Sequence, residues 1–91
     1  MTPAERAVLA ALLESDGRCL HEINLEPRDF STVQGEAVYG LIQEVVGSGR
    51  PADPLTVEDE ATRLDEASRR AVPPGYVWTL TDLSVSAASI T

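Results

Sequence analysis

The segment Asp29–Ala61 constrains the fold more than any other part of the sequence, because glycines and prolines divide it into two halves. In its first half, apolar residues recur at helical spacing and form one stripe: Val38, Leu41, Ile42 and Val45. Glycines follow, and helices commonly end at glycine. Pro51 and Pro54 favour extended backbone in the residues before them, so one helix does not run through this point. The pattern predicts a helix over about residues 32–48, an elbow and a second helix.

The second helix of this pair has its own start and stop signals. Thr56 is the predicted N-cap, with Asp59 three residues further on and acidic neighbours that suit the positive end of a helix. Four apolar residues then share one face: Val57, Ala61, Leu64 and Ala71. The sequence EASRRA continues with good helix formers, and a Pro-Pro-Gly sequence follows. We therefore predict one helix from about residue 57 to residue 72.

A helix is also predicted at the start of the chain, over about Pro3–Ser15. Thr2 is suited to cap it, proline occupies the favoured first position, and Glu5 completes a capping box. Its face is strongly apolar, which places it at the centre of the fold or under a partner. The next segment, Arg18–Asn24, is predicted to form a short helix that turns Leu20 and Ile23 inward.

The end of the chain predicts a closing helix over about Tyr76–Ser84. Three of its residues are expected to face inward: Tyr76, Leu80 and Leu83. Residues 86–91 have the composition of a further helix start, and Phe30 is expected to plug the core from a connector. No segment shows the alternation of a strand. The predicted fold is an all-α, compact orthogonal bundle of five to six short helices, in a single domain spanning residues 1–91.

The charge balance of the chain indicates which classes of partner it can bind. Fifteen acidic residues oppose seven arginines, lysine is absent, and the net charge is −8. Such a chain is repelled by phosphate backbones and anionic membrane surfaces unless its arginines cluster, and only Arg69 and Arg70 are adjacent. No apolar run approaches the length of a membrane span. With one cysteine, no intrachain disulfide can form, which fits a reducing cytosol. We therefore expect a cytoplasmic protein with neither nucleic acid nor membrane as a direct partner.

Motifs for catalysis or metal binding are weak. A P-loop needs a lysine to reach the phosphates, and none is available. Cys19 and His21 supply two possible zinc ligands where a site needs four, so an incidental surface histidine is the favoured interpretation. The acidic run Glu58-Asp59-Glu60 suggests a metal or acid–base site, or helix-start electrostatics on a solvated face, and we favour the latter. No catalytic, cofactor-binding or metal-binding residue is predicted.

Four motifs in order resemble one family. AERAVLAALL at residues 4–13, the pair DF at 29–30, the elbow SGRPADPLT at 48–56 and LTDLSVSAASI at 80–90 resemble the N-terminal domain of bacterial replicative DNA helicases, the DnaB family. This resemblance covers nearly the whole chain. It implies a non-catalytic collar domain on a hexameric motor, which contacts neighbouring helicase subunits and receives the C-terminal helical domain of primase. The helical hairpin, linker and ATPase motor of that family are absent from this sequence, so weak self-association at most is expected.

The resemblance also implies where the partner binds, namely on the first helix and the closing helix. The exposed positions expected there are Glu5, Arg6, Trp78, Thr79 and Asp82. Trp78 lies off the inward stripe of the closing helix. It is therefore either an interface anchor of the kind that dominates binding hot spots or a residue at the rim of the core. A second functional reading stays open: a stand-alone acidic adaptor or regulator of the replisome with a similar bundle, such as a primase helicase-binding-like domain.

The absence of lysine and the negative charge generate the first prediction. The 91-residue chain is expected neither to hydrolyse ATP nor to bind DNA detectably at physiological salt, because it has no phosphate-binding loop and repels the DNA backbone. Phosphate release and fluorescence anisotropy with labelled DNA test the two parts. Micromolar DNA affinity that weakens steeply with added salt would contradict the prediction.

Overall fold

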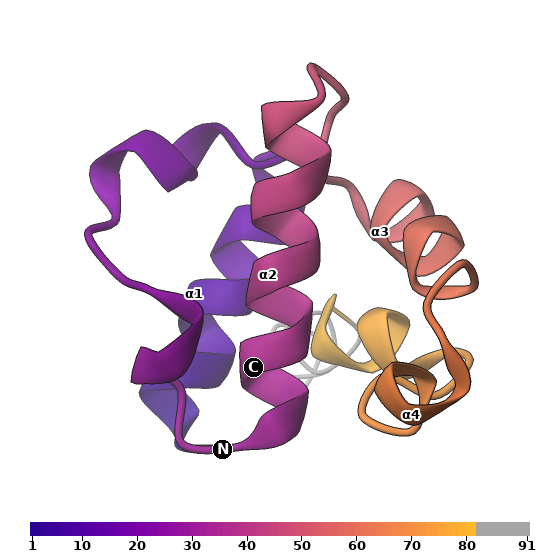
Figure 1. Cartoon of the computed structure of the whole chain (residues 1–91). Helices are drawn as coiled ribbons and strands as arrows, with labels where there is room; N and C mark the ends of the chain where they lie inside the picture. Colours follow the sequence, from indigo (N-terminus) through magenta and orange to yellow (C-terminus); the bar gives the residue numbers. More distant parts are fainter. Residues whose placement is uncertain (82–91) are drawn as a thin grey trace, which may run out of the picture.

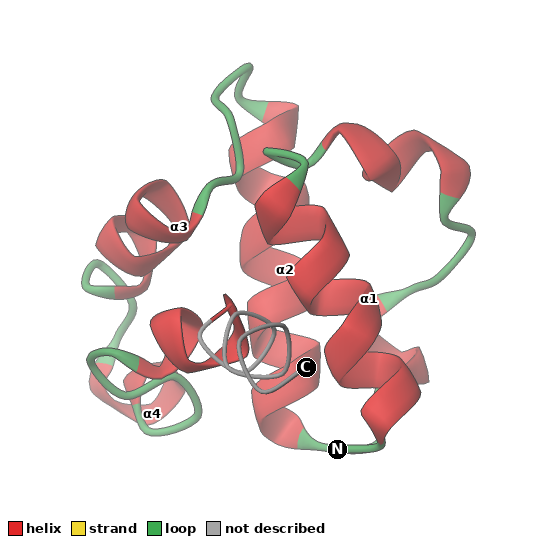
Figure 2. Cartoon of the chain, turned by 180° about the vertical axis from the view of Figure 1, so that it is seen from behind, coloured by secondary structure: helices red, strands yellow, loops and turns green. Residues whose placement is uncertain are grey.

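The computed structural model describes residues 1–81, and these form helices joined by short connections (Figure 1). The elements are α1 (Pro3–Glu14), η1 (Arg18–Glu22), η2 (Pro27–Asp29), α2 (Val33–Gly47), α3 (Pro54–Ala61) and α4 (Glu66–Arg69), where η marks a 3₁₀ helix. Residues 76–81 are also helical and are called the closing helix below. The described part of the chain contains no strand, as Figure 2 shows. The predicted all-α fold is confirmed.

The long helix α2 is the element around which the others pack. It contacts α1, η2 and α3, and Figures 1 and 2 show it between α1 and α3 in both views. Its inward stripe is fully or almost fully buried: Val38, Tyr39, Leu41, Ile42 and Val45. Leucines of α1, Val57 of α3, and Val77 and Leu80 of the closing helix complete the core. The predicted stripe and the bounds of this helix are therefore confirmed.

An aromatic pair closes the core at the side of α2 that faces η2. Phe30 is buried, as predicted, and its ring centroid lies 5.0 Å from that of Tyr39. The Tyr39 hydroxyl donates a hydrogen bond to the Leu25 carbonyl at 2.9 Å, which satisfies the one polar atom of this buried side chain. Burial raises the pKa of Tyr39, and nearby Asp29 acts in the same direction. The pair thus fastens the connector between η1 and α2 to the core.

The turn after α1 fits tightly against the elbow that follows α2. Gly17 has a φ of +85° and donates its N–H to the Leu12 carbonyl at 2.7 Å, which ends α1. A side chain at this glycine would meet Val46 Cγ2 at 2.5 Å and Ala52 Cβ at 3.0 Å. The Ala52 N–H also donates to the Asp16 carbonyl at 2.9 Å. Two turns far apart in sequence are therefore held together by backbone contact.

The structure corrects the predicted start of the helix after the elbow. Asp53, not Thr56, is the N-cap, and its carboxylate accepts the Thr56 N–H at 2.7 Å. Proline suits position 54, because backbone N–H groups in the first turn of a helix have no acceptor within the helix. The helix therefore begins at Pro54, three residues before the start predicted from Thr56 as N-cap. The acidic run Glu58–Glu60 consequently lies beyond the first turn of α3.

The single helix predicted over residues 57–72 is also wrong. Helix α3 ends at Ala61, and the chain turns before the four-residue helix α4. The cause is local: the Thr62 hydroxyl donates to the Asp59 carbonyl at 2.6 Å, and the Asp65 carboxylate accepts the Ser68 N–H at 2.8 Å. Threonine and aspartate side chains that bond the backbone in this way compete with helix continuation.

Smaller corrections concern the two ends of the chain. The segment predicted to form a helix over 18–24 is a 3₁₀ helix, although Leu20 and Ile23 do pack against the core. In the closing helix, Val77 and Leu80 are the buried pair, while Tyr76, expected to face inward, is only partly buried. The predictions for Asp82, for Leu83 and for a helix start at 86–91 lie outside the described residues.

The second prediction compares two glycines of equal backbone conformation. Gly17→Ala and Gly49→Ala both place a side chain at a φ near +85°, which costs about 1–2 kcal/mol. Only Gly17 has close neighbours, since a Cβ at Gly49 would meet nothing within 4 Å. Overpacking adds about 1–3 kcal/mol for Gly17→Ala. Urea denaturation followed by circular dichroism should show the larger loss in unfolding free energy for Gly17→Ala; equal losses would refute the tight contact.

Candidate protein-interaction surface

Glu5 ties the start of α1 to the chain just before α2. Its carboxylate completes the predicted capping box by accepting the Thr2 N–H at 3.3 Å and the Thr2 hydroxyl at 2.7 Å. It also accepts the Ser31 N–H at 2.6 Å and the Ser31 hydroxyl at 2.9 Å, across 26 residues of sequence. All of these partners belong to the chain itself. Glu5, predicted as an interaction residue, therefore acts first as an internal clamp.

The clamp has a clear electrostatic signature. The pKa of Glu5 is lowered from 4.5 to about 2, chiefly because the Ser31 backbone N–H donates to the carboxylate, and secondly because the Thr2 side chain does. Hydrogen bonds that reach an ionised carboxylate favour the charged form. The side chain is accessible to solvent, so water screens part of the effect.

Arg6, the next predicted residue, lies in a shallow groove where α1 meets the closing helix. The groove has a volume of about 330 Å³ and is lined by Pro3, Arg6, Ala7, Ala10, Ala11 and Glu14 of α1 and by Leu80. Most of this lining is apolar and small, so the backbone of α1 can be approached closely. Arg6 and Glu14 give the groove a positive and a negative group about 12 Å apart along the helix axis.

Trp78 and Thr79 stand on the outer side of the closing helix. Trp78 is 41% exposed and Thr79 is exposed, whereas Leu80 is buried. Because successive helical residues are about 100° apart, Trp78 points to nearly the opposite side of the closing helix from Leu80 and hence away from the groove. The structure thus places Arg6 at the groove and Trp78 on another face of the closing helix. Asp82 lies outside the described residues.

Glu58 of α3 holds the start of the closing helix. Its carboxylate accepts the N–H of Gly75, and the N–H of Val77 at 3.3 Å. Sequence reasoning missed this contact because the partners are 17 and 19 residues away. A signal was present nonetheless: the residue before Tyr76 is glycine, which has no side chain with which to cap the helix that follows.

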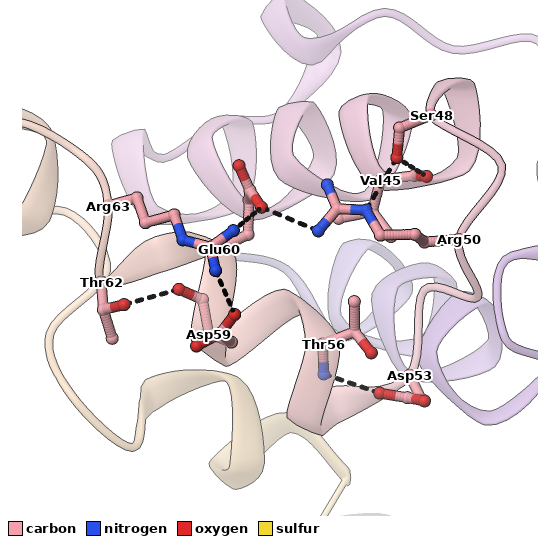
Figure 3. A network of polar contacts seen from close by, with 9 residues as sticks. All are labelled: Val45, Ser48, Arg50, Asp53, Thr56, Asp59, Glu60, Thr62 and Arg63. Carbon is pink, nitrogen blue, oxygen red and sulfur yellow. Dashed lines mark hydrogen bonds and ion pairs between the residues drawn. The ribbon is translucent and has the colours of Figure 1, made fainter.

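The remaining acids of α3 pair with arginines (Figure 3). Arg50 of the elbow reaches Glu60 at 3.1 Å and donates from Nε to the Ser48 hydroxyl at 2.8 Å. Arg63 contacts both Asp59 at 3.1 Å and Glu60 at 3.3 Å. The helix-start part of the favoured interpretation is therefore wrong, because the acidic run lies beyond the first turn of α3, whereas Asp59 is exposed, as expected for a solvated face. The run fixes α3 to the elbow and to the closing helix.

The described residues show neither a metal-binding cluster nor a helix able to cross a membrane. Within residues 1–81, no group of three or more histidine, cysteine or carboxylate side chains is arranged to hold a metal ion. His21 is exposed in η1, and Cys19 is a partly buried free thiol. Among the helices of this part of the chain, none combines the length and the apolar character that crossing a bilayer requires.

Comparison with known proteins agrees with this architecture. The model of the family described as the DnaB-like helicase N-terminal domain matches residues 1–91. The chain belongs to this family. A relative, the replicative DNA helicase DnaB of Leifsonia xyli subsp. xyli (strain CTCB07), is 36% identical over 87 residues, which cover 94% of this chain and 19% of the relative. This DnaB-like domain thus spans about a fifth of that protein's length. No solved structure matches it.

The third prediction follows from the clamp at Glu5. Its pKa is lower in the folded state than the ordinary 4.5, so the ionised carboxylate stabilises the fold above pH 4.5, and this contribution is lost as the pH falls towards about 2. Glu5→Gln should therefore be less stable than the wild type at neutral pH, and the difference should narrow across that window. Thermal melts over a pH series measure it.

Glu44→Gln, an exposed position on α2, is the control for loss of one negative charge. It should follow the wild-type curve. A stability difference between wild type and Glu5→Gln that is the same at pH 7 and at pH 2 would show that the ionised carboxylate is not what stabilises the clamp.

Proposed function

We propose that this DnaB-like domain is the N-terminal head of a replicative DNA helicase and serves DNA replication as a non-catalytic interaction module. In this role it contacts neighbouring helicase subunits in a collar and docks the C-terminal helical domain of primase. The family membership supports the helicase assignment. The relative's name, replicative DNA helicase, supports the same process. The domain itself acts in the cytoplasm without cofactor, and the motor that hydrolyses ATP is a separate part of the helicase.

The observation that carries the docking proposal is the groove between α1 and the closing helix. These are the two elements that the family resemblance implicates in primase docking. The groove is open, has an apolar floor of small side chains and ends in Arg6 and Glu14. A helix of a partner fits such a surface when its apolar stripe faces the alanines and its charges are opposite to those at the two ends.

Trp78 supplies the second contact of the proposed interface, on the exposed face of the closing helix outside the groove. An exposed tryptophan is a typical hot-spot residue, because it contributes a large apolar area and one hydrogen-bond donor. Thr79 accompanies it on the exposed side of the closing helix. Glu5 is assigned a different role from the one expected: it positions α1 through Ser31 rather than contacting the partner.

The charge of the domain suits a protein partner better than DNA. With a net charge of −8, direct contact with the DNA backbone is unfavourable. A complementary basic surface on the partner would accelerate association, and this acceleration would fall with added salt. Head-to-head contact between copies of this domain is proposed to be weak, so that collar formation depends on the remainder of the helicase.

The fourth prediction tests docking by titration calorimetry with the C-terminal domain of the cognate primase. Trp78→Ala should weaken binding by about 2 kcal/mol or more, because the tryptophan is the proposed anchor. Ala7→Glu should weaken it as well, since it places a charged side chain in the groove from an exposed helical position. Gln34→Glu, exposed on α2 and away from the groove, is the control with the same change in charge.

The outcomes separate the parts of the proposal. Absence of binding by the wild type at high micromolar concentration would remove the primase assignment and favour an adaptor with another partner. Wild-type affinity in Ala7→Glu would exclude the groove, and wild-type affinity in Trp78→Ala would exclude only the tryptophan.

A further inference from the structure

The closing helix differs from the other α-helices in how its first turn is capped. Each of α1 to α4 has an N-cap side chain that accepts a backbone N–H of its own first turn: Thr2, Thr32, Asp53 and Asp65. The closing helix follows Gly75, which has a φ of +85° and no side chain. The unpaired N–H groups at the start of a helix require an acceptor from elsewhere.

Glu58 provides that acceptor from α3. One carboxylate oxygen accepts the Gly75 N–H and the other accepts the Val77 N–H at 3.3 Å. Both contacts are partly buried, where hydrogen bonds to a charged group are stronger than at an exposed site. The negative charge also lies at the positive end of the helix. The Glu58 side chain thus accepts hydrogen bonds from two backbone N–H groups and also interacts favourably with the dipole of the closing helix.

Apolar contacts on both sides of Gly75 hold the closing helix in place. Residues 65–70, which include α4, are exposed, but Ala71 and Val72, just before the closing helix, are buried in the core. Val77 and Leu80 are buried and hold the closing helix against the core. Apolar burial is non-directional, however, and permits small rotations of a short helix about its axis. The two hydrogen bonds to Glu58 restrict that rotation.

Helix α3, which carries Glu58, is itself held firmly in the fold. Val57 and Ala61 anchor it in the core, the Asp53 carboxylate caps its start, and the Arg50–Glu60 ion pair joins it to the elbow. Its contacts with α2 fix it to the central helix. A carboxylate on such a fixed element acts as a rigid reference for the helix that it caps.

We infer that Glu58 is a positioning residue for partner binding: it sets the direction of Trp78 and the place of Leu80 in the groove without touching the partner. The inference deepens the proposed function, and its affinity component rests on that function. Loss of the cap should leave the domain folded, since the core is unchanged, but should let the closing helix rotate and present Trp78 over a range of directions.

Trp78 is the only tryptophan of the chain, so its fluorescence reports directly on the closing helix. The fifth prediction compares wild type, Glu58→Ala and Glu58→Gln by acrylamide quenching and fluorescence anisotropy of Trp78, and by titration with the primase domain. Glu58→Ala should lower the residual anisotropy and change the quenching constant, and it should weaken binding about tenfold, the equivalent of one lost cap. Glu58→Gln, which keeps a neutral acceptor, should restore part of both signals.

Asp59→Asn is the matched control, because it removes a charge from the same helix and breaks the exposed ion pair with Arg63 but leaves the cap and the Arg50–Glu60 ion pair intact. It should leave the Trp78 signals unchanged. Wild-type quenching and anisotropy in Glu58→Ala would overturn the inference, as would equal changes in Asp59→Asn. If wild type fails to bind primase, the proposed partner is refuted, and the fluorescence comparison alone decides whether Glu58 positions Trp78.

Discussion

Burial of one face of α2 is the interaction on which the rest of the structure depends. This helix contacts α1, η2 and α3, and no fully buried side chain in the described residues is charged. The core is built from aliphatic side chains and alanine, with one aromatic pair at its edge. Its stability therefore depends on shape and volume, because apolar burial is non-directional and does little to fix how each helix is oriented. Polar contacts at the surface must fix the orientation of the helices.

Two carboxylates help to fix the orientation of the helices. Glu5 holds the chain before α2 to the start of α1, and Glu58 holds the start of the closing helix to α3. Both accept backbone N–H groups rather than pairing with arginine. The chain has fifteen acidic residues and only seven arginines, so not every carboxylate can form an ion pair. A carboxylate that accepts backbone N–H groups is stabilised without an arginine partner. The acidic composition is thus compatible with a well-ordered surface.

The sequence predicted those features that depend on local spacing. The capping box of Thr2 and Glu5, the stripe and bounds of α2, and the burial of Phe30 were all accessible from near neighbours in the chain. The break after α3 was not predicted, because the residues after Ala61 are good helix formers, while the N-cap at Asp65 that starts a new helix resembles an ordinary helix residue in the sequence. The bonds from Glu5 to Ser31 and from Glu58 to Gly75 join residues 26 and 17 positions apart, and no periodicity encodes them. The groove, similarly, exists only once two helices meet.

The exposed stretch around α4 has a consequence for how this domain tolerates changes in chain length. The closing helix receives its cap from Glu58, and buried Ala71 and Val72 hold the chain just before it, so its place does not depend on the exposed residues 65–70. We expect insertions or deletions within residues 65–70 to leave the closing helix in place, provided the chain still spans the gap. This stretch is where chain length is freest to change, and a longer excursion here would add new surface beside α2 and α3 without disturbing the core.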